Sequence, residues 1–236
     1  LVARLQDTLS SDQATRDAAE QYLAHETLPK SGTDDVLGVQ LAQILSEASL
    51  SLFVRQAAAI ALKKYVRKRW SIFFDTFTQD MVVNGIVQTV DATPVEAKEH
   101  IRTSLLACLC DAEPKVRSQA SDILSLISSC DFPDHFPQLL PTLQAYLHSY
   151  TEQDAHAAYK VHGAMKFLLD LVHVELDENQ LLMVAQQLVP LLQGIVSSSS
   201  DWITPHTRAR CINVFHQCLI SLYMAKDTYA DTVHMV

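Results

Sequence analysis

The sequence predicts an all-α fold built as a stack of antiparallel helical hairpins. Three observations lead to this prediction. The chain of 236 residues contains only 5 glycines and is 48% hydrophobic, a composition that favours helices and provides few tight β-turns. Apolar residues recur at helical spacing in several segments, which indicates helices with one buried face. These segments also share a short opening motif, which indicates an internal repeat.

The clearest helix is Val54–Trp70. Its apolar residues fall at offsets 0, 3, 4, 7, 8, 11 and 12 from Val54, which places them on one face of an α-helix. The same spacing recurs in Cys211–Tyr223 and, with small lapses, in Val116–Cys130 and Val161–Leu176. Four helices of one design are therefore expected.

A short motif opens these helices, in which a basic residue precedes a small one that would let a neighbouring helix approach closely. The motif reads Arg16-Asp-Ala-Ala, Arg55-Gln-Ala-Ala, Arg117-Ser-Gln-Ala and Arg208-Ala-Arg-Cys, with Lys160-Val-His-Gly-Ala as a variant. The step from Arg16 to Arg55 is 39 residues and that from Lys160 to Arg208 is 48. Repeats of the HEAT and armadillo type have a period of about 40 to 47 residues. The sequence therefore predicts an α-solenoid, a superhelix of HEAT repeats.

One step is too long for a single repeat. Arg55 and Arg117 are 62 residues apart, which exceeds the period by about half a repeat. The excess lies in residues 71–93, where Phe73, Phe74 and Phe77 precede a weaker helical pattern. We expect an insertion or a long connector there.

A partner helix is expected between successive helices of this design. The residues Ser10-Ser11-Asp12 suit a turn and a helix cap, Pro114 suits the first turn of a helix, and residues 197–201 form a polar break. The partner helices are Leu1–Ser10, Asp34–Ala48, Pro94–Cys110, Pro137–Ser149 and Asn179–Val196.

Pairing these helices produces about five hairpins in a single array over residues 1–236, with no need for a domain linker. One hairpin cannot bury its apolar face alone, whereas stacked hairpins share a continuous core and leave two long exposed surfaces. Such surfaces suit extended protein binding. The approximate repeats are residues 1–27, 34–70, 94–130, 137–176 and 179–226.

Charge and cysteine content narrow the function further. Acidic residues outnumber basic ones, 27 against 18, so the surface should attract basic proteins and repel nucleic acid backbones.

The 5 cysteines are odd in number and lie in apolar helical patterns, and the amino terminus does not resemble a signal peptide. We expect a soluble protein of a reducing, intracellular compartment with no membrane insertion, because no uninterrupted apolar run approaches about 18 residues. The start without methionine and the end in mid-pattern suggest a fragment of a longer protein.

No arrangement of residues points to catalysis, a cofactor or a metal. Cys108 and Cys110 would point to different faces of one helix, so they cannot both bind a metal from an intact helix. The histidine pairs His156 with His162 and His206 with His216 lack the spacing of helical zinc ligands. A glycine-rich phosphate loop, a nucleophile elbow and a carboxylate pair are all missing from the sequence. We therefore expect a binding protein and not an enzyme.

Two segments resemble a particular repeat family. The sequence from Val54 to Trp70, with its Arg-Gln start, Leu-Lys-Lys centre and terminal tryptophan, resembles the second repeat of the importin-β (karyopherin) family. Lys64 stands where that family usually has asparagine. The segment Asp131-Phe-Pro-Asp-His-Phe-Pro-Gln-Leu-Leu140 resembles the third repeat, with Phe136 where tryptophan is commoner.

The prolines and phenylalanines of that segment have a physical role. Pro133 and Pro137 would end one helix and start the next. Phe132 and Phe136 would fill the gap between repeats. A third segment, Val161-His-Gly-Ala-Met-Lys-Phe-Leu-Leu-Asp170, is similar to the fourth repeat of the importin nine branch, including its fungal members. The resemblance covers almost the whole chain and matches only the amino-terminal quarter or so of such receptors.

The resemblance implies a nuclear transport receptor that shuttles between cytoplasm and nucleus. Its amino-terminal repeats would bind Ran-GTP through the inner, second helices of the hairpins. Its other partners would be nucleoporins and basic cargo proteins such as core histones and ribosomal proteins, and the acidic balance fits such cargo. A HEAT-repeat scaffold or adaptor without a transport role is the alternative.

A basic cluster ends the second-repeat helix. Of its members, Lys63, Lys64 and Arg67 are candidates for contact with Ran, since the resemblance implies a partly acidic Ran surface there. Solvated cations at a helix carboxyl end would also suit the helix dipole without any partner. Nucleic acid binding is disfavoured, because the rest of the chain is acidic and the basic face has no interleaved aromatic residues. Trp70 is expected to pack in the core.

Further candidates for Ran contact lie on the first and third of these helices. Asp17, Glu20, Gln21 and Ala24 lie off the predicted core face of the first. Exposed polar residues without a partner are the alternative interpretation of these positions. The corresponding positions of the third helix are Gln119, Asp122 and Ser125.

Overall fold

The predicted all-α class of HEAT type is confirmed by the helices of this chain. The computed structural model describes residues 1–27, 36–71, 80–83, 86–89, 93–152, 155–173 and 176–224. The α-helices in this part of the chain are α1 (Val2–Asp7), α2 (Gln13–Glu26), α3 (Leu37–Ser46), α4 (Leu52–Arg69), α5 (Val95–Cys108), α6 (Pro114–Asp131), α7 (Leu139–His148), α8 (Ala155–His173), α9 (Glu178–Ser197) and α10 (Pro205–Met224). A short 3-10 helix, η1 (Ser149–Thr151), follows α7.

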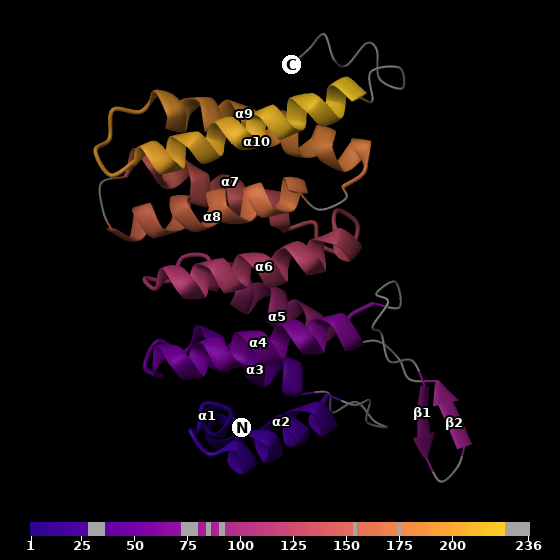
Figure 1. Ribbon diagram of the computed structural model, residues 1–236. Coiled ribbons are helices and arrows are strands. Elements are labelled where there is room, and N and C mark those ends of the chain that lie inside the picture. The colour runs from indigo at the N-terminus through magenta and orange to yellow at the C-terminus, as the bar shows by residue number, and fades with distance from the viewer. Residues whose placement is uncertain are drawn as a thin grey trace. The chain divides into compact units, whose positions relative to one another are not determined.

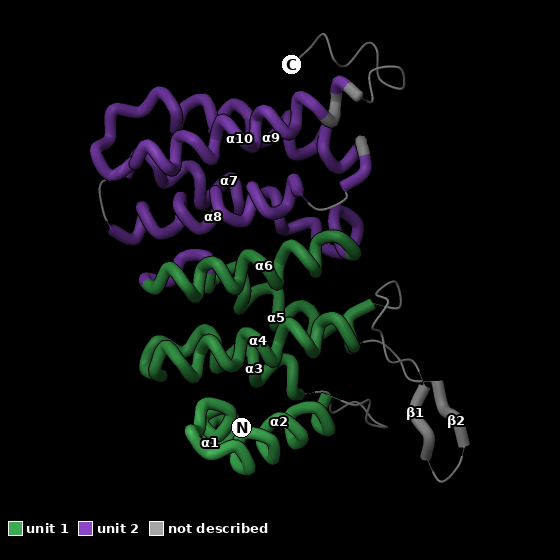
Figure 2. Tube along the Cα trace, viewed as in Figure 1, with its two compact units in different colours: residues 1–108, 113–130 green, residues 109–112, 131–236 purple. Residues whose placement is uncertain are grey.

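The chain forms two compact units (Figure 2). Unit 1 comprises residues 1–108 and 113–130, and unit 2 comprises residues 109–112 and 131–236. The division into five repeats and a single array stays a prediction.

Unit 1 contains α1 to α5 and nearly all of α6, and α1 pairs with α2 and α3 with α4 (Figure 1). Helix α3 packs against both α4 and α5, and α1 packs against α2 and α4. The apolar stripe of α4 lies largely in this core, since Val54, Ala58, Leu62 and Tyr65 are buried. Helical periodicity therefore identified the buried face of α4 correctly.

The opening arginines have a role that sequence reasoning missed. Two of them donate a hydrogen bond to a carbonyl near the end of the preceding helix: Arg55 Nε to Leu45 O at 2.8 Å, and Arg208 to Val196 O. Arg16 donates to Ser10 O, just beyond α1, at 2.6 Å. The last carbonyls of a helix have no partner within the helix. The arginine therefore lies in the first turns of the second helix and caps the carboxyl end of the first.

Trp70 is fully buried, as predicted. The Lys98 ammonium lies 5.1 Å from the centre of the Trp70 ring and the Arg102 guanidinium carbon 5.6 Å from it. Both cations come from α5, and cations over an indole face are attracted by its negative charge density. The carboxyl end of α4 is thereby joined to α5.

The segment between α4 and α5 contains two strands, which the sequence analysis did not predict. Strand β1 (Asp80–Val83) pairs antiparallel with β2 (Ile86–Thr89), with Asp80 opposite Thr89. Four of their eight residues are valine or isoleucine, and β-branched residues favour strands. Phe73, Phe74 and Phe77 lie outside the described residues, and the role of the segment as an insertion or connector stays a prediction.

Unit 2 is built from α7 to α10. Helix α7 packs against α8 and α9, and α10 packs against α8 and α9. Gly163 on α8 lies against the backbone of Leu109, because a Cβ added to Gly163 would lie 1.8 Å from the Leu109 carbonyl oxygen. The close approach expected of the small residue in the opening motif is found here.

The joint between α6 and α7 follows the prediction from its prolines and phenylalanines. Helix α6 ends at Asp131 and α7 begins at Leu139, so both prolines lie between the helices. Phe132 and Phe136 are buried. The Phe132 carbonyl accepts a hydrogen bond of 2.5 Å from Gln180 Nε2, which also completes the capping box with Asp177 at the start of α9. This joint is therefore tied to the amino end of α9.

One helix of the described part, α9, is long and apolar enough over Asn179–Ser197 to cross a membrane by length and composition alone. The core helix of a soluble protein passes the same test. Leu181, Val184, Leu188 and Ile195 of α9 are buried, and α9 contacts α7 and α10. A core role accounts for its composition.

Candidate protein-binding groove

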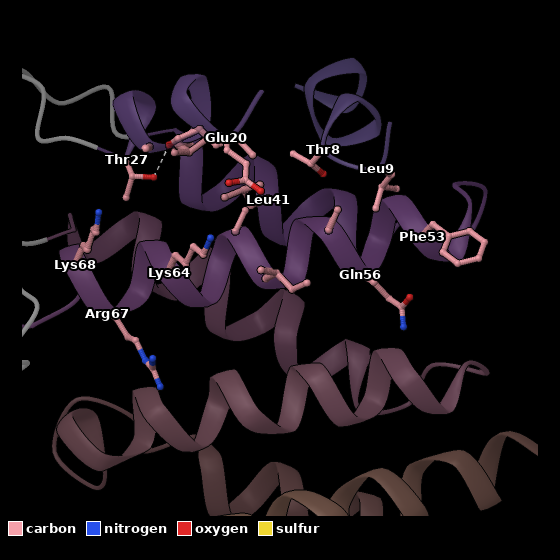
Figure 3. Close-up of a pocket in the computed structure, with 16 residues that line it drawn as sticks. Thr8, Leu9, Glu20, Thr27, Leu41, Phe53, Gln56, Lys64, Arg67 and Lys68 are labelled. Atoms are coloured by element: carbon pink, nitrogen blue, oxygen red, sulfur yellow. Dashed lines mark hydrogen bonds between the residues drawn. The ribbon is translucent and has the colours of Figure 1, made fainter. Parts of the chain in front are cut away.

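A groove of about 630 Å³ lies in unit 1 between α2 and α4. The end of α1 and the start of α3 also contribute to its lining. Its floor is apolar: Leu41 and Leu37 are buried, and Ala57 and Ala61 of α4 are half-buried beside them. The groove therefore presents apolar surface at its base and the side chains of two second helices along its sides (Figure 3).

Large apolar side chains line one end of the groove and remain exposed. Leu9 is 51% exposed, Phe53 66% and Ile60 56%, and all three line the groove. Exposed apolar side chains are common singly, but a contiguous patch marks an interaction site. This end of the groove is therefore suited to an apolar partner surface.

The other end of the groove is cationic. Lys64, Arg67 and Lys68 come from the last turns of α4, and Glu20 of α2 is the one acidic residue in the described lining. Figure 3 shows Lys64 and Lys68 reaching toward the α2 side of the groove and Arg67 pointing away from α2. The negative end of the α4 dipole favours cations at this position. Lys64 and Lys68 make no ion pair or hydrogen bond with any other residue in the described ranges.

Four of the predicted Ran-contact residues meet in this groove. Glu20 and Ala24 lie on α2, and Lys64 and Arg67 on α4. Asp17 and Gln21 are exposed on α2 but do not line the groove.

A second group of the predicted residues lies between α4 and α6. Lys63 Nζ is 3.8 Å from Asp122 Oδ2, and both side chains are partly exposed. An exposed ion pair contributes little to stability, so a partner could replace it at small cost. Gln119 is half-buried, and its Oε1 is a buried acceptor without a hydrogen bond within the described structure.

The expectation that Ser125 lies on an accessible surface is wrong. Ser125 is only 5% exposed, and its hydroxyl donates to the Ser121 carbonyl at 2.9 Å. Ser121 and Ser128, each about one turn away on the same side, are also buried. A serine that bonds to the carbonyl four residues earlier can lie inside a helical interface, which the polar pattern of α6 concealed.

The apolar end of the groove was missed by the sequence reasoning, although a signal exists. Phe53, Ala57, Ile60, Lys64 and Arg67 are spaced at offsets 0, 4, 7, 11 and 14, which form a second helical stripe beside the buried one. A helix with two such stripes has both a core face and a face suited to a partner.

The described residues contain no metal-binding cluster, and two of the buried thiols are unreactive at neutral pH. In this part of the chain, no group of three or more histidine, cysteine, aspartate or glutamate residues is placed to hold a metal ion. All five cysteines are free thiols. Burial raises the pKa of Cys211 and of Cys218 to about 11, so these two thiols stay protonated at neutral pH and are poor nucleophiles.

Residues 19–111 match the family model described as "Importin-beta N-terminal domain". The chain is 28% identical over 193 residues to importin subunit beta-5 of Schizosaccharomyces pombe, covering 81% of this chain and 18% of that protein. It is 24% identical over 222 residues to importin-9 of Drosophila melanogaster, covering 94% and 19%. Exportin-2 of Drosophila melanogaster is 27% identical over 140 residues, covering 59% and 13%. The chain thus spans less than a fifth of the length of these relatives.

Solved structures show the same fold. Yeast importin-beta (Kap95p) matches 96% of this chain with a TM-score of 0.68, at 16% sequence identity and over 24% of its own chain. A Kap95:Nup1 complex also matches with a TM-score of 0.68, at 17% identity, over 99% of this chain and 26% of that chain. A third match, with a TM-score of 0.61, 14% identity and 98% and 25% coverage, is a Kap95p structure in which binding induces the switch loops of RanGDP to adopt the GTP-bound conformation.

Proposed function

This chain belongs to the importin-β (karyopherin) family of nuclear transport receptors, and we propose that its second helices α2, α4 and α6 bind Ran-GTP. The observation that carries the proposal is the gathering of Glu20, Ala24, Lys64 and Arg67 in one groove. The family match at residues 19–111 contains α4 and part of α2.

The proposed contact combines apolar and charged surface. Lys64 and Arg67 stand at the edge of an apolar groove, where a partner that covers them would exclude water. Charge complementarity then speeds encounter and suppresses wrong partners, more than it raises affinity. Lys63 and Asp122 extend the same surface toward α6. Kap95p, which has a similar fold, binds RanGDP and induces the GTP-bound conformation of its switch loops, which supports Ran as the partner.

Transport requires that Ran-GTP and cargo oppose each other. Two ligands that favour different states, or overlapping sites, of one receptor lower each other's affinity by the same factor. The resemblance to the importin nine branch implies basic cargo, and we propose core histones and ribosomal proteins as examples. The net charge of −9 is compatible with such cargo, since a negative field attracts basic proteins. Nucleoporins are further proposed partners, supported by the Kap95:Nup1 complex among the similar structures. The protein would shuttle between cytoplasm and nucleus.

The proposal is tested by the affinity of the 236-residue chain for immobilised Ran-GTP, measured by biolayer interferometry. A double substitution, Lys64→Glu with Arg67→Glu, should weaken binding by about a hundredfold, since a few kcal/mol are lost when two cations in a contact are reversed. The matched control is Lys115→Glu, an exposed position at the start of α6, which should change affinity little. If the double substitution binds Ran-GTP as the unchanged chain does, this surface is not the Ran site.

A further inference from the structure

We infer that the groove between α2 and α4 is also a docking site for an acidic amphipathic helix of a partner protein. Such a helix would insert apolar side chains beside Phe53 and Ile60 and bring carboxylates to Lys64 and Lys68. This inference concerns a peptide ligand of the groove, and it does not depend on Ran binding.

The apolar half of the site stands on three exposed side chains around a buried floor. Leu9, Phe53 and Ile60 are each more than half exposed, whereas Leu41 of the same lining is buried. Because removing apolar surface from water is favourable, covering these side chains favours association. A partner with charged side chains at this end would bury those charges without water or a counter-ion, which opposes binding.

The charged half of the site stands on unpaired cations. Lys64 is exposed and Lys68 half-buried, and neither has an ion pair or hydrogen bond with the rest of the described chain. With Arg67, they set three cations against the single carboxylate of Glu20 in the described lining. The lining is therefore positive although the whole chain has a net charge of −9. An acidic segment is complementary to this end of the groove, and a basic one is not.

The spacing of these groups fits a helix. At a rise of 1.5 Å per residue, Phe53 and Lys64 lie about 16 Å apart along α4. An amphipathic helix of three to four turns spans that length and presents side chains at i, i+3, i+4 and i+7 to a groove.

Nucleic acid fits this groove less well than an acidic helix does. Bases of single strands stack on aromatic side chains placed among cations. Phe53 is the one aromatic residue in the described lining, and it lies at the end of the groove away from the lysines.

The test is fluorescence anisotropy of the 236-residue chain with a labelled peptide of about 16 residues. The probe carries leucine and phenylalanine at helical spacing in one half and three glutamates in the other, and a second probe has the two halves exchanged. At least one of the two should bind. Matched peptides with glutamine for glutamate, or serine for the apolar residues, should bind about tenfold more weakly or worse, since each loses a complementary group.

Paired substitutions locate the binding site. Ile60→Glu should weaken peptide binding about tenfold, whereas Ile212→Glu, the same change at a similarly exposed position of α10, should not. The double substitution Lys64→Glu with Lys68→Glu should also weaken peptide binding about tenfold, whereas the control Lys115→Glu should not. A probe with lysine in place of glutamate should restore binding to the double variant. All of these side chains are at least partly exposed, and circular dichroism verifies that each variant is folded.

Three results would overturn the inference. One is equal binding of the glutamine peptide, which would mean apolar contact alone. Another is a single-stranded oligonucleotide that binds more tightly than either acidic peptide. The third is equal weakening by the groove substitutions and their controls. The peptide measurement contains no GTPase, so an absence of peptide binding does not bear on the proposed Ran contact. An absence of Ran binding likewise does not bear on the peptide site.

Discussion

The opening arginine of each of three second helices donates a hydrogen bond to a carbonyl at or just beyond the end of the preceding helix. Arg55 is 3% exposed and donates to the Leu45 carbonyl at 2.8 Å. Periodicity marks Arg55 as polar and says nothing about where its side chain goes. The direction of the Arg55 side chain depends on where the fold places the Leu45 carbonyl, ten residues earlier. The sequence therefore shows the motif but not the hydrogen bond that it makes.

Replacing Arg55 with leucine should lower the free energy of unfolding by about 2 kcal/mol, because a buried carbonyl loses its donor. Urea denaturation followed by circular dichroism measures this change. Lys115→Leu serves as the control, since Lys115 is exposed and its loss should cost less than about 0.5 kcal/mol. Equal midpoints for the two variants would contradict the assigned role of Arg55.

The buried thiols of α10 predict a loss of stability in alkaline solution. Burial raises the pKa of Cys211 and Cys218 in the folded chain from 9.0 to about 11. The unfolded chain therefore loses thiol protons at lower pH than the folded one, and the stabilising difference is present below pH 9. It is lost as the pH rises through the window from 9 to about 11.

Denaturation at several pH values checks this window, with the double substitution Cys211→Ala and Cys218→Ala as the comparison. The variant should be less stable at neutral pH, because it leaves cavities, but its stability should fall less steeply above pH 9. A parallel decline in both chains would assign the effect to other groups.

Helix α4 illustrates at the scale of an element what helical spacing does and does not reveal. Its buried stripe was predicted from apolar offsets and is found in the core. Its second stripe, from Phe53 to Arg67, mixes apolar and basic residues, so a search for apolar periodicity overlooks it. The strands β1 and β2 were missed for a related reason, because short β-branched runs fit helix and strand patterns alike.

Helix α8 is sensitive to the size of one residue. Gly163→Ala should destabilise the chain by about 1 to 3 kcal/mol or more, because the added methyl group collides with backbone of Leu109 that cannot move freely. Gly194→Ala on α9 is the matched control. There the added atom meets the end of the Tyr150 side chain at 2.7 Å, which can rotate away, and alanine favours the helix.

Thermal unfolding of the two glycine variants gives the comparison. Gly163→Ala should lower the melting temperature, while Gly194→Ala should change it little or raise it. If both variants melt alike, the close approach at Gly163 does not limit the packing of α8.

Repeated local patterns in the sequence are enough to predict the fold of the chain, but they do not identify its family. Helical periodicity and the opening motif predict stacked hairpins without reference to any relative. The family depended on the particular residues of Val54–Trp70 and Asp131–Leu140, which lie at the ends and joints of helices. The contact residues were harder to predict, because exposure depends on neighbouring elements. Glu20 and Lys64 meet in a groove, whereas Ser125, chosen by the same logic, is buried.

We propose that this chain is the part of a nuclear transport receptor that recognises the GTP-bound state of Ran. The most direct measurement is the affinity of the 236-residue chain for Ran loaded with GTP and for Ran loaded with GDP, under identical conditions. The predicted result is binding at least about tenfold tighter to Ran-GTP, a difference of about 1.4 kcal/mol. Equal affinity for the two states, or no binding of either by the folded chain, would contradict the claim.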